Sequence, residues 1–304
     1  MRRLPLHLWI ACAILAVIVL GVLLAPWISP YPPAEQNLAT RLAAPGAGHL
    51  LGTDHLGRDT LSRLLDGGRF SLTLAALATV ITAVAGTAIG VLSARRRGWL
   101  DEFLTRTNDV LLAMPEMVVA LFLVAILGTG YPSLLLALTV TGWTPFARLA
   151  RSLALDVSAR GFVEAAHVLR CPPSFIVMKH IIPHLAAPLL GQATLRFGHF
   201  LINVGALSYL GLGVQPPQSD WGSMLAAAQP YAARAPMTIL APGLVIFAVA
   251  LCVTLLGQHL SRTSRLTPAQ VLAPEAVPAH AQRARHRGPP RGAAGFPFFP
   301  GHSA

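Results

Sequence analysis

Charged residues are scarce in this 304-residue chain: they make up 12%, about half the charged fraction of a typical soluble domain. Cysteine is rarer still, and Cys12, Cys171 and Cys252 stand far apart, without the paired spacing of a disulfide framework or a metal site. Apolar residues, in contrast, make up 54% of the chain, and the mean hydropathy is +0.60. This balance argues against a soluble enzyme, a disordered chain or a collagen-like fibre, and it indicates a multi-pass membrane protein.

Lysine is almost absent, since Lys179 is the only lysine among 23 basic residues and the other 22 are arginine. A P-loop that binds ATP needs a lysine after the pattern Gly-x-x-x-x-Gly, whereas Lys179 stands in the sequence Val-Met-Lys-His. The chain therefore cannot bind ATP through a P-loop. Any process that it drives with ATP must take the energy from a separate subunit.

Six apolar runs approach the roughly 20 residues that a helix needs to cross a bilayer, at about 8–27, 70–94, 110–127, 131–147, 185–213 and 237–257. The first run could be a signal peptide, but it is longer than usual and ends in a poor cleavage site, so an uncleaved anchor is favoured. Pro115 and Glu116 stand in the first turns of the third run. We therefore predict an all-α membrane protein with six transmembrane helices.

The orientation follows from the basic residues in the connecting loops. With the N-terminus in the cytoplasm, 17 arginines and lysines fall on the inside and five on the outside, with Arg196 within a span. Both termini are therefore predicted to be cytoplasmic. The formal charge of +11 is mostly this topology signal, and a nucleic-acid partner is not needed to explain it.

We expect three parts along the chain: an anchor helix with an outer loop (1–69), a core of five transmembrane helices (70–262) and a disordered, basic cytoplasmic tail (263–304). From about residue 267 the tail is rich in Ala, Pro, Gly, Arg and His and lacks an apolar period, so it cannot bury a core. The outer loop is predicted to be structured. Within it, Asp59 is placed to cap a short amphipathic helix that reaches Leu65 and leads into the second span.

The inner loop from Arg148 to His184 contains a segment with good helix formers at residues 161–170. That helix is expected to end near Cys171, because Pro172 and Pro173 follow it. Ser174 is predicted to cap a second stretch, 175–182, which Pro183 stops. A short helix that projects from a membrane bundle suits insertion into a groove on a cytoplasmic partner, and an ordinary connecting loop is the alternative.

Three long motifs resemble those of one known family. Residues 51–71 are similar to LGTDxLGRDxxSRLLxGxRxSL, residues 162–188 to the EAA loop that docks on an ATPase, and residues 208–225 to SFLGLGVQPPxxxWGxML. Over residues 8–262 the chain thus resembles the inner-membrane permease subunits of bacterial ABC importers, in the dipeptide, oligopeptide and nickel branch. The resemblance implies a type I ABC importer permease architecture with a cytoplasmic coupling loop.

The family also implies partners and a location. A permease of this kind works in the bacterial inner membrane with a homologous second permease, two ATPase subunits and an extracytoplasmic solute-binding protein. ATP and Mg²⁺ are used by the ATPase subunits, so the resemblance implies no cofactor bound by this chain.

The resemblance places Glu164, Ala165 and Ala166 on the coupling helix, which transmits closure of the ATPase subunits to the bundle. A bulky residue at Glu164 or Ala166 is accordingly expected to uncouple ATPase stimulation from transport. The chain departs from the family at Arg170, where a glycine is usual, and in the run 171–173, Cys-Pro-Pro. We expect the prolines to break the helix in place of the glycine, and Arg170 to meet the ATPase directly.

Polar residues inside the fifth run are candidates for the translocation path. Arg196, His199 and Asn203 are three and four positions apart and share one face of a helix. Charged groups within a span usually face a bundle interior or a cavity, so this stripe is predicted to line the path or the interface with the second permease. Alternatively, the three groups satisfy one another between helices, or Arg196 extends to the interface. Glu116 is expected to pair with an arginine.

The cargo is less clear than the family. Peptide-transporting relatives have an acidic residue before the third motif, where this chain has Val204, and the run 197–205 resembles nickel-importer subunits. The resemblance therefore favours nickel or a nickel chelate, with dipeptides and oligopeptides as the alternative. No metal site is predicted, since His180 and His184 are separated by Pro183 and no ligands converge. A self-contained secondary transporter would need inverted repeats and ion-coupling carboxylates, and a membrane enzyme a converging catalytic set; neither is visible.

Overall fold

The computed structural model describes residues 5–96 and 98–271, with side chains described as far as residue 261. Within these residues every regular element is a helix, and the β-type pairing consists of one isolated bridge between Thr53 and Asp59. The all-α class is thereby confirmed. The elements are α1 (Leu6–Leu23), α2 (Ala25–Ile28), η1 (Leu38–Thr40), α3 (Thr60–Arg95), α4 (Trp99–Ala113), α5 (Glu116–Leu127), α6 (Tyr131–Gly142), α7 (Thr144–Ser158), α8 (Gly161–Val168), α9 (Pro173–Phe175), η2 (Ile176–Ile181), α10 (Ile182–Tyr209), α11 (Trp221–Ala228), η3 (Gln229–Tyr231) and α12 (Met237–Val271).

Four of these helices or helix runs are long and apolar enough to cross a membrane: Leu6–Leu23, Thr60–Arg95, Pro173–Tyr209 and Met237–Ser261. A fifth candidate is the pair α4 and α5, which meet at an angle of 92°. The predicted third span, 110–127, is thus divided, because Pro115 lacks an N–H and holds Met114 in an extended conformation. The predicted fourth span, 131–147, covers α6 and the start of α7, which adjoin at Trp143.

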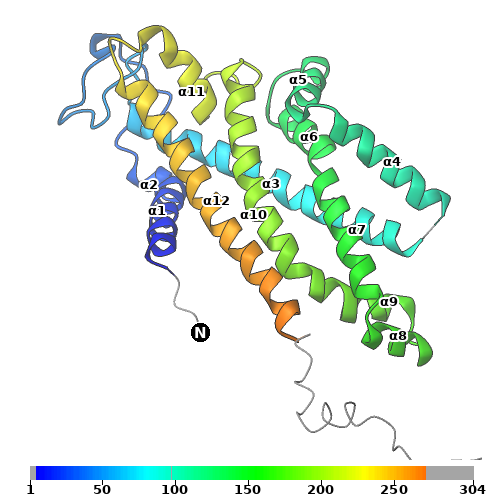
Figure 1. Ribbon diagram of the computed structural model, residues 1–304. Coiled ribbons are helices and arrows are strands. Elements are labelled where there is room, and N and C mark those ends of the chain that lie inside the picture. Colours follow the sequence, from blue (N-terminus) through cyan, green and yellow to red (C-terminus); the bar gives the residue numbers. More distant parts are fainter. Residues whose placement is uncertain (1–4, 97, 272–304) are drawn as a thin grey trace, which may run out of the picture. The chain divides into compact units, whose positions relative to one another are not determined.

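Helix α3 is the element to which much of the chain attaches (Figure 1). The Asp59 side chain caps its N-terminus by accepting a hydrogen bond from the Ser62 N–H at 2.8 Å. The predicted short amphipathic helix does not end at Leu65, because the helix runs on without a break into the second span. The expected boundary between residues 69 and 70 therefore lies inside one helix.

Small residues bring α3 and α7 close together. A Cβ atom on Gly86 would lie 2.6 Å from the Phe146 Cβ, and one on Gly90 would lie 2.9 Å from the Ala150 Cβ. Helices in membranes pack closely through such small residues, because van der Waals contact replaces the missing hydrophobic drive. The two glycines thus fix the distance between the second span and the helix that leads to the inner loop.

The inner loop departs from its prediction at Pro183, which does not stop a helix. Pro172 is the N-cap of α9 in place of the expected Ser174, and a π-helical stretch, η2, joins α9 to α10. Pro183 stands in the first turn of α10, where its missing N–H is not needed. α9, η2 and α10 therefore form one helical run of 37 residues.

The segment 29–59 contacts α3 and η3, and α11 is in turn bonded to α3. Asp220 and Ser223 form a capping box at the start of α11, and the buried Trp221 donates its indole N–H to the Leu64 carbonyl at 2.8 Å. The Tyr231 ring stacks on His55 with centroids 5.4 Å apart, and the Arg41 guanidinium lies 5.7 Å from its centroid. The predicted structured loop is thus held at several points.

Helix α12 begins at the predicted position and continues to Val271. Residues 263–271, assigned above to a disordered tail, are therefore helical. The rest of the predicted tail, 272–304, lies outside the described residues. Among the described residues, those up to 264 form one compact unit, and residues 265–271 belong to a second.

Acid pH should weaken the attachment of the segment 29–59. Burial lowers the pKa of His55 below 6.5; Asp54 opposes this shift, and Arg58, Arg63 and Arg41 add to it. A histidine with a lowered pKa in the folded state stabilises the fold fully above pH 6.5, and that stabilisation is lost as the pH falls below this value. We expect the thermal midpoint to fall between pH 8 and pH 5 by more in the wild type than in His55→Phe, which keeps a ring against Tyr231. An equal fall in both proteins would contradict the assignment.

Candidate functional site

Helix α8 carries the predicted coupling residues and is anchored by one apolar face. Val163 and Ala166 are buried, and they belong to a cluster that includes Val157 of α7 and Ile176 and Ile181 of η2. Glu164 stands in the first turn, where a negative charge favours the helix N-terminus. The opposite face is open to solvent, and Glu164 and Ala165 lie on it.

The prediction for Ala166 needs correction, because the structure turns this residue inward. Its side chain is 6% exposed, so a bulky replacement would disturb packing against α7 and η2 before it touched any partner. Val168 and Leu169 are instead 78% and 77% exposed, although both are apolar. The exposed face of α8 and its C-cap thus includes Glu164, Ala165, Val168 and Leu169.

The helix ends in a Schellman motif and not, as expected, at the prolines. Arg170 has a φ of +56°, and its N–H donates to the His167 carbonyl at 3.0 Å, while the Cys171 N–H donates to the Ala166 carbonyl at 3.1 Å. Glycine is favoured at such a left-handed position, because it has no Cβ. Arg170 therefore adopts the left-handed conformation that favours glycine, at the position where the resemblance implies a glycine, and Pro172 and Pro173 follow after the turn.

Aromatic contacts hold α8 against the run that leads into α10. The Phe162 ring stacks on His184 with centroids 5.2 Å apart and lies 5.9 Å from His180. The His184 Nδ1 lies 2.6 Å from the His180 carbonyl oxygen. The two histidines thus support α8, a role that the sequence analysis missed. Phe162 could have indicated this contact from the sequence, because an aromatic residue next to the buried Val163 tends to pack against a neighbouring element.

A second polar group forms where α5 begins. The Arg196 guanidinium donates two hydrogen bonds to the Glu116 carboxylate, at 2.8 and 3.1 Å, and also lies 4.8 Å from the Phe200 ring centroid. The His199 Nε2 lies 3.2 Å from the same carboxylate. The expected pairing of Glu116 with an arginine is confirmed. The bond ties the elbow between α4 and α5 to the middle of α10.

The structure brings together two of the three predicted path residues. Arg196 and His199 converge on Glu116, whereas Asn203 is buried at the next turn of α10. The exposed fractions of the side chains are 11% for Arg196, 22% for Glu116 and 48% for His199. His199 is therefore the most exposed member of this group. Among the described residues, no three His, Cys, Asp or Glu side chains gather into a metal-binding group.

Comparison with known proteins identifies the family. Residues 86–266, more than half of the chain, match the family described as "Binding-protein-dependent transport system inner membrane component". The chain belongs to this family. Residues 8–45 also match the N-terminal transmembrane domain of oligopeptide transport permease C.

Individual relatives are also transport system permeases. The chain is 36% identical over 250 residues to a di/tripeptide transport system permease of Pseudomonas aeruginosa. The match covers 80% of this chain and 82% of the relative. It is 34% identical over 251 residues to the nickel transport system permease of Escherichia coli K12, with 83% and 91% covered. A solved structure of the MetNI methionine ABC transporter in inward-facing conformations shares the fold, with a TM-score of 0.55 and 16% identity. The match covers 66% of this chain and 96% of the MetNI chain.

These matches establish the role of the chain at the level of the family. It is a transmembrane permease subunit of an ABC importer and a multi-pass protein of the inner membrane. Members of this family are non-catalytic membrane subunits, and they work with separate ATPase subunits and with a binding protein. The type I permease architecture implied by the sequence is confirmed.

A glycine at position 170 should stabilise the coupling loop. The left-handed conformation costs a residue with a Cβ about 1 kcal/mol, so Arg170→Gly should raise the thermal midpoint of the purified permease. Leu169→Gly is the matched control, since Leu169 is also exposed but has a φ of −74° and should lose stability. Thermal unfolding in detergent measures both, and a lower midpoint for Arg170→Gly would refute the argument.

Proposed function

We propose that this chain forms half of a translocation path and pairs with a homologous second permease and two ATPase subunits. An extracytoplasmic binding protein delivers the cargo. Substrate delivery and ATP binding bias the bundle outward, and hydrolysis resets it inward. The observation that carries this proposal is the exposed face of α8, which presents a small residue and two apolar side chains on a helix of eight residues.

The exposed face of α8 suits a groove on an ATPase. Val168 and Leu169 lose contact with water when they are covered, which favours docking, and the small Ala165 allows the helix to approach closely. The Schellman motif fixes the end of the helix, so that movement of the ATPase passes to α7 and η2 without being absorbed in a loose turn. Arg170 is exposed at the tip and supplies a positive charge to the partner.

The orientation with both termini in the cytoplasm places α8 on the side of the ATPase. The excess of arginine on that side supports this orientation. It places the segment 29–59, α11 and η3 on the outer side, where a binding protein would dock. ATP and Mg²⁺ then act only in the partner subunits, because Lys179 stands outside any P-loop pattern.

The polar group at Glu116 is our candidate for a point of contact with the cargo. Arg196 neutralises the carboxylate, which allows it to lie within the membrane bundle, and His199 remains open beside it. The cargo that we propose is nickel or a nickel chelate, or else a short peptide. The run 197–205 favours nickel, whereas the match of residues 8–45 to an oligopeptide permease favours peptides.

Coupling is tested at Ala165. Ala165→Trp should abolish transport and the stimulation of ATPase activity by the loaded binding protein, while the chain still inserts, because the ring blocks close approach of the partner. Glu164→Trp should act in the same direction, and Ala165→Ser, which keeps the size, should behave as wild type. Ala166→Trp should instead lower the amount of folded protein. Normal coupled transport in Ala165→Trp, measured in proteoliposomes with all partners, would refute the assignment of α8.

The cargo is tested by uptake of labelled nickel and of a labelled dipeptide in cells with and without this chain, all partners being present. Loss of nickel uptake alone would support nickel, and His199→Ala should then reduce that uptake several-fold. Loss of dipeptide uptake alone would support peptides and would leave His199 with a structural role. Unchanged uptake of both would refute the proposed cargo classes.

A further inference from the structure

The carboxylate of Asp101, in the first turn of α4, joins three helices. Arg151 of α7 donates two hydrogen bonds to it, from Nε to Oδ1 and from Nη2 to Oδ2, both at 2.7 Å. Ser93, near the C-terminal end of α3, donates its hydroxyl to the same Oδ1. A bidentate bond between an arginine and a carboxylate fixes the orientation of both groups as well as their distance. Asp101 therefore holds α4 to both α3 and α7.

Partial burial makes this bond firmer than an ion pair on the surface. The exposed fraction is 17% for the Asp101 side chain and 34% for that of Arg151. The neighbouring pair of Glu102 and Arg106 is 70% and 76% exposed, with a contact of 3.3 Å. Exposed ion pairs contribute little, because water and salt compete for the charges. Of these two pairs, the one at Asp101 is also the one that connects α4 to another helix.

A second ion pair joins the same two helices. The Nη2 of Arg148 donates to the Oδ1 of Asp109 at 2.6 Å. Arg148 stands three residues before Arg151, so both arginines face the same side of α7. Asp109 follows Asp101 by eight residues, which is about two turns of α4. Two bonds spaced along one helix resist both its separation from α7 and its rotation against α7.

Close packing holds the remaining side of this group, between α3 and α7. A Cβ atom on Gly90 would lie 2.9 Å from the backbone nitrogen of Arg151. The α7 residue that bonds Asp101 is therefore also a residue that lies against α3. Each pair among the three helices has a direct contact: glycine packing for α3 and α7, ion pairs for α7 and α4, and the Ser93 hydroxyl for α3 and α4.

These three helices lie between two groups that the proposed mechanism uses. Val157 of α7 packs in the same apolar cluster as Val163 of α8. Helix α4 leads to the elbow, after which Glu116 at the start of α5 bonds Arg196 of α10. A displacement of α8 thus has a continuous route of packed and bonded groups to Glu116.

We propose that Asp101 is a positioning residue that makes α3, α4 and α7 move as one unit during transport. The inference rests on the proposed function, in which an ATPase moves α8. When α8 moves, α7 carries α4 with it through Asp101, and the elbow at Pro115 displaces Glu116 relative to Arg196. Without the bond at Asp101, α7 follows the ATPase while α4 and the elbow lag behind.

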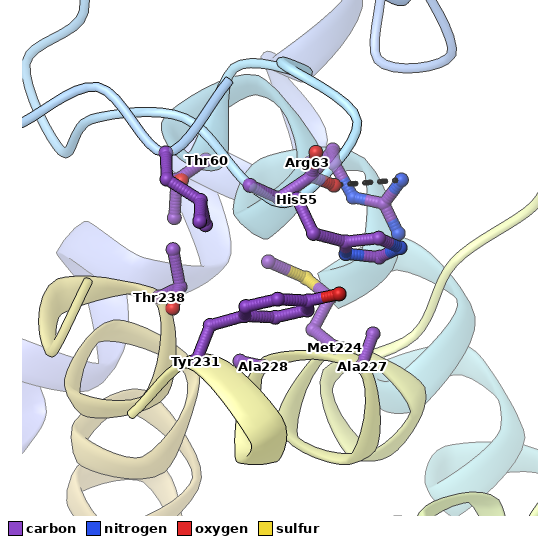
Figure 2. Close-up of a pocket in the computed structure, with 10 residues that line it drawn as sticks. His55, Thr60, Arg63, Met224, Ala227, Ala228, Tyr231 and Thr238 are labelled. Carbon is purple, nitrogen blue, oxygen red and sulfur yellow. Dashed lines mark ion pairs between the residues drawn. The ribbon is translucent and has the colours of Figure 1, made fainter. Parts of the chain in front are cut away.

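The opposite end of α3 is held separately. Figure 2 shows Arg63 of α3, His55 and Tyr231 together around one small pocket. Ser93 stands 30 residues after Arg63, roughly 45 Å along a helix that rises about 1.5 Å per residue. A variant at Asp101 therefore leaves these attachments in place, and its effect reports on α4 and α7.

Distances between spin labels in the transporter assembled with its second permease and ATPase subunits test the unit directly. The label positions are the exposed Val110 on α4, Asp156 on α7 and Leu190 on α10, in a chain whose three cysteines are replaced by alanine. Between the nucleotide-free state and the state trapped with ATP and vanadate, the distance from 110 to 156 should stay constant. The distance from 110 to 190 should change.

The variant Asp101→Asn keeps the size of the side chain and removes its charge. With ATP and vanadate, the distance from 110 to 156 should broaden into two populations, and the change from 110 to 190 should shrink although nucleotide is still trapped. Arg151→Gln should do the same, and the double variant should be no broader than either single one, since both remove one interaction. Glu102→Gln is the matched control, because it breaks the exposed pair on the same helix, and it should behave as wild type.

Two results would overturn the inference alone: a distance from 110 to 156 that changes with nucleotide in the wild type, or one that stays single and narrow in Asp101→Asn. The first of these uses no variant at Asp101, so it decides the matter even where that variant fails to assemble. Failure of the proposed function gives a different result. The distance from 110 to 190 would then not change with nucleotide in the wild type, which would overturn the mechanism and the inference together.

Discussion

Close packing of α3 is the constraint on which the rest of the unit depends. Gly86 and Gly90 let α7 approach α3 at backbone distance, and Ser71 of the same helix accepts a hydrogen bond from the Trp221 N–H at 3.2 Å. One helix therefore holds the inner loop through α7 and the outer segment through α11. A larger residue at either glycine would separate α7 from α3, and with it α8, which packs on α7.

Two sets of side-chain contacts hold other helices to this framework, one at α8 and one at Glu116. At the inner end, α8 is held by Val163, Ala166 and the Phe162 ring, which leaves its other face free for a partner. In the middle, the bond between Glu116 and Arg196 fastens the elbow of α4 and α5 to α10. In the proposed mechanism, movement of the helices would pass through these contacts.

The family match does not identify the cargo, so the cargo classes must be distinguished at individual side chains. Relatives at 34–36% identity include both a di/tripeptide permease and a nickel permease, so overall similarity does not separate the two cargo classes. Val204 stands before the third motif, at the position where the resemblance to peptide-transporting relatives implies an acidic residue. Its side chain is fully buried, whereas His199 is half exposed. His199 is thus the better residue on which to test a difference between cargoes.

The sequence by itself determined the membrane class, the approximate positions of four of the six predicted spans and the family, because apolar length and long motifs are local properties of the chain. The sequence also placed the Asp59 cap and indicated that Glu116 would pair with an arginine. Only the tertiary structure decided that Ala166 faces inward, that Arg170 adopts the left-handed conformation, that Pro183 continues a helix and that the third span bends at Pro115. The inward face of Ala166 depends on α7 and η2, which are separate elements of the chain. The other three are local choices of backbone conformation that the residue types alone left open.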